Sequence, residues 1–152
     1  MSERATHEEG FVAGAEALIF GLLILLLATF VVLNAWVALD TRFAVAGAAR
    51  DAVRAVVTAP VGADLGEVAI TAATGAFAAQ GRDLAHLEVE WLGGGGPPAQ
   101  ARCAEVRLQV RTVVDVVAVP RWTDRSSYRV AAEHAERIEP FRSGLEASVC
   151  PA

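Results

Sequence analysis

The chain has 152 residues, enough for one small domain and one further segment. Hydrophobic residues make up 54% of it, the formal net charge is −5, and all thirteen basic residues are arginines that form no long basic run. Nucleic-acid binding relies on clustered cations that neutralise phosphates, so this composition argues against a nucleic-acid partner. Most of the apolar excess lies in the N-terminal part.

An uncharged run of 23 residues extends from Ala17 to Leu39. About 20 helical residues span the ~30 Å hydrocarbon core of a bilayer, so the run predicts a transmembrane helix with Trp36 as an interfacial anchor. A cleaved secretory signal is the weaker alternative. Its hydrophobic region has about 7–15 residues and follows basic residues, whereas the flank SERATHEEG has three Glu and one Arg. A buried soluble helix is disfavoured, because a chain of this size could hardly enclose it.

The arginines near the run bear on its orientation. Arg4 precedes the run, whereas Arg42, Arg50 and Arg54 follow it. By the positive-inside rule alone, the C-terminal part would be cytoplasmic.

The helical pattern continues beyond the membrane run to Thr58. Apolar residues at three- and four-residue spacing predict one buried stripe, formed by Leu39, Phe43, Ala46, Ala49, Val53 and Val56. Pro60 cannot continue the helix. Asp64 and Glu67 have the spacing of a capping box and predict the start of a second, short helix, for which Gly81 is the expected stop.

The period then changes to the alternation of β-strands. HLEVEWL, residues 86–92, predicts a half-buried strand, and a long strand is predicted from Ala104 to Val119. The segment YRVAAEHAER fits a strand or a helix, and we expect a strand because the long strand needs a neighbour on each side. The predicted fold class is α+β: a long N-terminal transmembrane helix extended into a helix, a second short helix, and a three-stranded antiparallel meander.

The sequence contains no recognisable catalytic or metal-binding motif. The three histidines have no metal-ligand spacing, and no nucleophile turn or phosphate loop occurs. We therefore expect no enzyme activity, no metal and no cofactor. Cys103 and Cys150 are either a disulfide, which would stabilise an extracytoplasmic domain by about 2–4 kcal/mol, or two unrelated reduced thiols.

Four features occur in a characteristic order: Gly10 after a polar leader, Glu16 at the front of the span, the helix FAVAGAARDAVRAVV, and a strand-rich part ending in ERIEPFR. Together they resemble the TadE-like family of pilus-assembly proteins, the pilin-like minor components of tight-adherence (Flp) type IV pilus systems. The resemblance implies that a prepilin peptidase cuts after Gly10, that Phe11 becomes the new N-terminus, and that the C-terminal domain lies outside the cytoplasm.

The resemblance also implies a role for Glu16. A carboxylate at mid-span costs about 2.5–3.5 kcal/mol on insertion scales and less near the end of a span. A freshly exposed N-terminal amine would be its partner, and the pair would set the axial register of packed helices. Family members usually place this Glu fifth after the cut, whereas Glu16 is sixth. The alternative is that Glu16 only marks the membrane boundary.

The implied organisation is a leader or cytoplasmic tail over residues 1–10, a transmembrane helix over 11–39 and an extracytoplasmic α+β domain over 40–152. The implied partners are membrane lipid, other minor or major pilins and the inner-membrane platform, in a hetero-oligomer anchored in the plasma membrane. A second hypothesis is a membrane-tethered binding module without a pilus role, which predicts no N-terminal processing.

Overall fold

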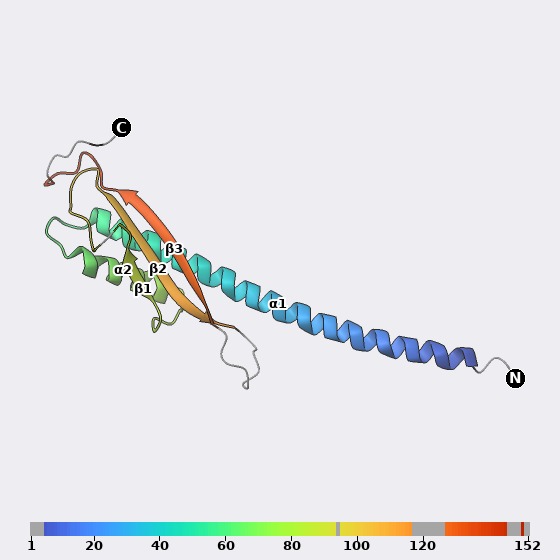
Figure 1. Cartoon of the computed structure of the whole chain (residues 1–152). Helices are drawn as coiled ribbons and strands as arrows, with labels where there is room; N and C mark the ends of the chain where they lie inside the picture. Colours follow the sequence, from blue (N-terminus) through green and yellow to red (C-terminus); the bar gives the residue numbers. More distant parts are fainter. Residues whose placement is uncertain (1–4, 94, 117–126, 146–149, 151–152) are drawn as a thin grey trace.

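The computed structural model describes residues 5–93, 95–116, 127–145 and 150, with the helix backbone alone over residues 5–15. Helix α1, Ala5–Thr58, is followed by helix α2, Leu65–Ala79. Three strands follow: β1 (Glu88–Trp91), β2 (Glu105–Asp115) and β3 (Ser127–Arg137). All pairs are antiparallel, in the order β1-β2-β3 (Figure 1). This arrangement confirms the predicted α+β fold class.

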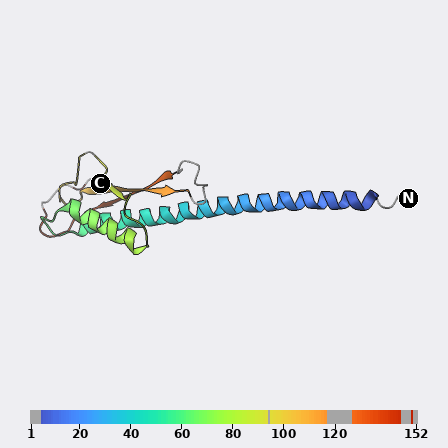
Figure 2. The ribbon, with the colours of Figure 1, turned by 90° about the horizontal axis from the view of Figure 1, so that it is seen from below.

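The two halves of α1 have different surroundings. Its N-terminal half projects away from the rest of the chain, whereas its C-terminal half lies along the sheet (Figure 1, Figure 2). There α1 packs against β2, β3 and α2, and α2 reaches β1. The folded part therefore has two layers, with the helices covering one face of the sheet.

The core lies between these layers. Strand β2 provides its central row, in which Val106, Leu108 and Val110 are fully buried and alternate with exposed or half-buried polar residues. Strand β2 is flanked on both sides, as its length required. Strand β3 places Tyr128, Val130 and Ala132 toward the same core, in agreement with its predicted alternation.

The buried face of α1 differs from the predicted stripe. Ala49, Val53 and Val56 are buried as expected, but Leu39, Phe43 and Ala46 are exposed. The buried face is centred on the small and β-branched residues Thr41, Ala44, Val45, Ala48, Ala49, Ala52, Val53 and Val56. The sheet packs on one side of α1 and α2 on another. This face of α1 is the buried one because its small side chains let the backbones of α1, α2 and the sheet approach closely.

The ends of α2 follow the sequence signals. The Asp64 carboxylate accepts hydrogen bonds from the backbone N–H groups of Gly66 (2.9 Å) and Glu67 (3.1 Å) and so caps the first turn. At the other end the N–H of Gly81 donates to the carbonyl of Ala78, with Gly81 at φ 69°, a conformation that glycine adopts at low cost.

Strand β2 is shorter than predicted. It runs from Glu105 to Asp115, and Val116 lies outside it. The rest of the predicted strand, residues 117–119, and its predicted end at Pro120 lie outside the described residues. At the start, the carbonyl of Ala104 accepts a hydrogen bond from the N–H of Ile138, so pairing with the chain after β3 extends beyond the strand.

Candidate functional site

The exposed half of α1 is the most distinctive surface of the described chain. The helix has an 18-residue window of mean hydropathy 2.7, none of which is buried, so by length and composition it is long and apolar enough to cross a membrane. Two polar side chains within it are bonded to their own helix: Thr29 donates to the carbonyl of Leu25 (2.8 Å) and Asn34 to that of Phe30 (2.9 Å). Such internal bonding is what a lipid environment requires of polar groups.

The residues predicted to act in processing and assembly lie at the front of this helix. Gly10 and Phe11 belong to the continuous backbone of α1, and Glu16 follows less than two turns later with an exposed side chain. The cut after Gly10 and the charge pairing of Glu16 stay predictions.

Polar side chains with partners lie where α1 enters the folded part. The Asp40 carboxylate forms an ion pair with Arg82, which lies just after α2. One residue later Thr41 is buried, and its hydroxyl donates to the carbonyl of Val37 (2.8 Å). The charge of Asp40 is therefore compensated close to the end of the apolar span.

The C-terminal end of α1 is closed by two side chains from distant parts of the chain, Gln100 and Arg142, here called the α1 cap. The Arg142 guanidinium donates to the carbonyls of Val57 and Ala59, which lie 85 and 83 positions away. The amide group of Gln100 donates to the carbonyl of Pro60 (3.1 Å) and accepts from the N–H of Gly62 (3.0 Å). Helix ends leave carbonyls unpaired and carry partial negative charge, so a guanidinium suits this position.

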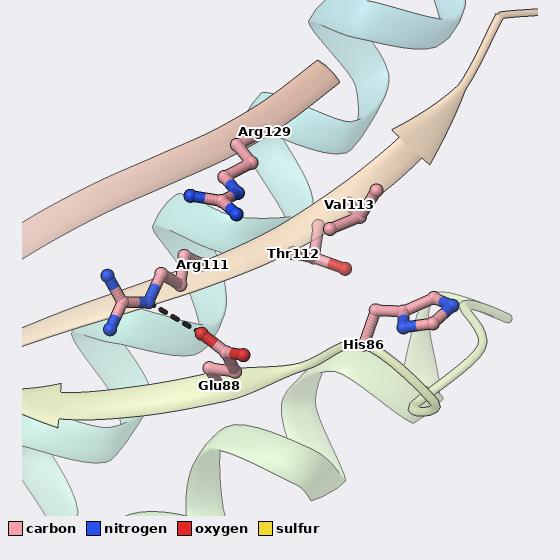
Figure 3. Close-up of a pocket in the computed structure, with 6 residues that line it drawn as sticks. All are labelled: His86, Glu88, Arg111, Thr112, Val113 and Arg129. Carbon is pink, nitrogen blue, oxygen red and sulfur yellow. Dashed lines mark hydrogen bonds and ion pairs between the residues drawn. The ribbon is translucent and has the colours of Figure 1, made fainter. Parts of the chain in front are cut away.

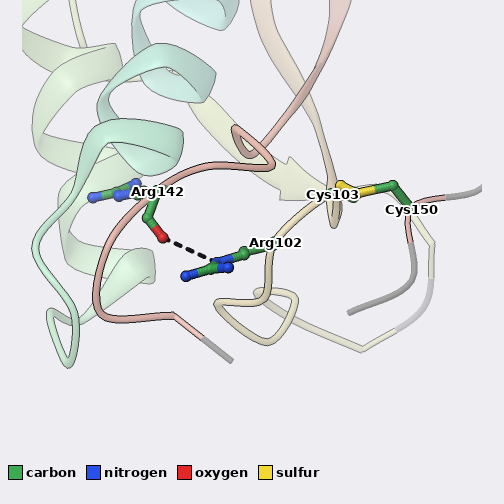
Figure 4. The surroundings of a disulfide bond; sticks show 4 residues. All are labelled: Arg102, Cys103, Arg142 and Cys150. Atoms are coloured by element: carbon green, nitrogen blue, oxygen red, sulfur yellow. Dashed lines mark hydrogen bonds between the residues drawn. A yellow bond between two sulfur atoms is a disulfide. The ribbon is translucent and has the colours of Figure 1, made fainter. Parts of the chain in front are cut away.

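A disulfide lies beside the α1 cap. Cys103 and Cys150 are joined across 47 positions, with their Cα atoms 5.3 Å apart (Figure 4). The neighbouring Arg102 donates from Nε to the carbonyl of Arg142 (3.0 Å). The N–H of Cys103 also donates to the carbonyl of Ile138 (3.0 Å). The end of α1, the start of β2 and the segment after β3 are thus connected at one place.

The solvent face of the sheet holds the main alternative site. Arg111 on β2 lies between Glu88 (2.7 Å) and Glu90 (2.5 Å) of β1. Arg111 and Glu88, with His86 and Arg129, line a pocket of about 270 Å³ (Figure 3). That volume lies below the ~300–1,000 Å³ of usual small-molecule sites. Since Arg111 is already matched by two carboxylates, the pocket is best explained as cross-strand ion pairing.

Among the described residues, no group of three or more His, Cys, Asp or Glu is placed to hold a metal ion. Comparison of the chain with models of known protein families, with curated proteins and with solved structures finds no match. The features of the described chain that bear on function are therefore the architecture of α1 and its connection to the domain.

Sequence reasoning missed the α1 cap and the ion pair between Asp40 and Arg82. Both join residues far apart in the chain, and no local spacing signals them. The one available hint was Pro60 two residues after the end of α1, which predicts a helix end whose carbonyls need partners.

Proposed function

We propose that this protein is a single-pass membrane protein that acts as a pilin-like minor component in the assembly of a tight-adherence pilus. Its α+β domain would lie outside the cytoplasm, and other pilins and the inner-membrane platform would be its partners. It would act through helix packing and subunit contacts, without chemistry of its own.

The observation that carries this proposal is the continuity of α1. One helix of 54 residues provides both the exposed apolar half and the wall of the domain on which the sheet packs. The domain is therefore fixed to the span without a flexible linker. A subunit of this kind can make membrane and domain contacts in one fixed register, which assembly requires.

The attachment of the C-terminal end of α1 to the rest of the domain also supports an assembly role. The α1 cap and the disulfide hold the far end of the helix to both the start of β2 and the segment after β3. A force or a contact on the domain is then transmitted to the membrane helix. A tethered binding module has no such requirement, because a flexible tether is sufficient for capture.

The first test is the intact mass of the protein purified from native membranes, with and without reduction and alkylation. We expect a mass that matches a start at Phe11, with Cys103 and Cys150 resistant to alkylation until reduced. A full-length mass with both thiols free would contradict processing and the extracytoplasmic location and would favour the tethered module in the cytoplasmic orientation. A start near the end of the apolar run would instead identify the N-terminal half of α1 as a cleaved signal.

The second test concerns Glu16. We expect Glu16→Gln to abolish assembly while leaving membrane insertion intact, because the neutral amide cannot form an ion pair with a neighbouring charged amine. Glu67→Gln is the matched control, since Glu67 is exposed on α2 and belongs to the folded part. Pili recovered from cells carrying each variant give the readout. Normal pili with Glu16→Gln would show that Glu16 only marks the membrane boundary.

A further inference from the structure

We propose that the exposed face of α1 at the base of the domain binds the lipid headgroup layer, so that the domain rests on the membrane surface. This basal face consists of Trp36, Leu39 and Phe43. The inference depends on α1 being a membrane span, as in the proposed function, but it does not depend on pilus assembly.

The three side chains share one side of the helix. Their spacing of three and four residues places them within about one third of the helix circumference. Trp36 is 72% exposed, Leu39 54% and Phe43 73%. On the opposite side of the same turns, Thr41, Ala44 and Val45 are buried in the domain. The basal face is therefore apolar surface that the described chain leaves uncovered.

The length of the helix places this face at the membrane surface. From Ala17 to Leu39 the rise is roughly 34 Å, enough for the ~30 Å hydrocarbon core. From Ala17 to Phe43 it is roughly 39 Å, which is close to the hydrocarbon core plus one headgroup layer, together ~35–38 Å. Trp36 then lies near the end of the hydrocarbon, where indole rings are enriched, and Phe43 lies at the outer edge of the headgroup layer.

The charges near the basal face agree with this depth. Asp40 is the first carboxylate after the span, and its ion pair with Arg82 lowers the cost of placing it beside lipid. Arg42 is exposed next to Phe43 and can reach anionic headgroups. Farther along the side of α1 that carries Phe43, the exposed residues become cationic at Arg50 and Arg54, which suits water.

Lipid is favoured over a second protein as the occupant. The basal face continues directly from the apolar window of α1, none of which is buried. It also consists of large side chains, whereas helices that pack in membranes meet through small ones. One environment, the bilayer and its surface, therefore accounts for the whole exposed apolar length.

The test is nitroxide labelling of single added cysteines in the full chain, reconstituted in phosphatidylcholine vesicles with a fraction of phosphatidylglycerol. The two native cysteines are joined to each other, so an added thiol is labelled selectively. Phe43→Cys is the test position. Ile70→Cys is the matched control, because Ile70 is also a large exposed apolar residue but lies on α2. Leu39→Cys and Arg50→Cys give the gradient along α1.

Collision rates with oxygen, which enriches in lipid, and with a water-soluble nickel complex report the depth of each label. We expect the oxygen-to-nickel ratio to be severalfold higher at position 43 than at 70, and to fall from 39 through 43 to 50. Equal oxygen-to-nickel ratios at positions 43 and 70 would overturn the proposal, since position 43 would then be in water and not in contact with the bilayer. Low accessibility of position 43 to both reagents would also overturn it, because a protein partner would then cover the face. A full-length or processed mass leaves these outcomes unchanged, so this test and that of the pilus function fail separately.

Discussion

Replacing Arg142 by methionine tests whether the α1 cap stabilises the joint between helix and domain. The guanidinium donates to the carbonyls of Val57 and Ala59 at the end of α1. A hydrogen bond to a charged group contributes about 1.5–3 kcal/mol, and the charge at the negative end of the helix adds about 0.3–1 kcal/mol. Because Arg142 is half-buried, water can replace part of this interaction, and we expect Arg142→Met to lower the free energy of unfolding by about 2–4 kcal/mol.

Two further variants separate the causes. Arg142→Lys keeps the charge but not the forked donor geometry. Its free energy of unfolding should therefore lie between those of the unchanged chain and Arg142→Met. Arg54→Met removes an exposed arginine of α1 and should change the free energy of unfolding by less than about 0.5 kcal/mol.

The assay is urea unfolding of the full chain in detergent micelles, followed by near-ultraviolet circular dichroism, which reports the packing of aromatic residues in the domain. Two results would contradict a stabilising role of the α1 cap. One is a free energy of unfolding for Arg142→Met within about 0.5 kcal/mol of that of the unchanged chain. The other is an equally large decrease for Arg142→Met and Arg54→Met.

Three other predictions use the same unfolding assay. Cys103→Ser should cost about 2–4 kcal/mol, and Cys150→Ser added to it should cost little more, because the first substitution already opens the disulfide; additive losses would contradict a shared bond. Asp64→Ala should cost about 1 kcal/mol and Asp64→Ser much less, since serine can also accept at the start of α2, and equal losses would argue against capping. Leu108→Ala should cost about 2–5 kcal/mol because Leu108 is fully buried in β2. Val113→Ala on the solvent face of the same strand should cost much less, and a loss as large as that of Leu108→Ala would place the core on the other face.

Much of the fold could be predicted because its signals are local. The apolar run indicates a span through its length alone, and Pro60, Asp64 and Gly81 mark helix ends through backbone chemistry. The alternation of β2 and β3 indicates which side chains face the core, because successive residues of a strand point to opposite sides. The strand assignment of the ambiguous segment was correct because β2 needs a neighbour on each side.

The candidate site could be predicted only in part. The positions of Gly10, Phe11 and Glu16 relative to the span come from the sequence and the resemblance, and their roles stay predictions. The two cysteines were singled out as a candidate pair, but nothing local places their disulfide beside the end of α1. The α1 cap was not predicted, since Arg142 and Val57 are 85 positions apart and are brought together only by folding.

The sequence by itself determined the elements, their order and the apolar span, because each depends on neighbouring residues. Only the tertiary structure decided how α1 is rotated about its axis. The periodic pattern allows Phe43 to be inside, but the sheet and α2 together bury the small residues Ala44, Ala48 and Ala52 instead. Close packing of α1 against the sheet and α2 favours small side chains at the contact, so Phe43 is left on the outer, exposed side of the helix.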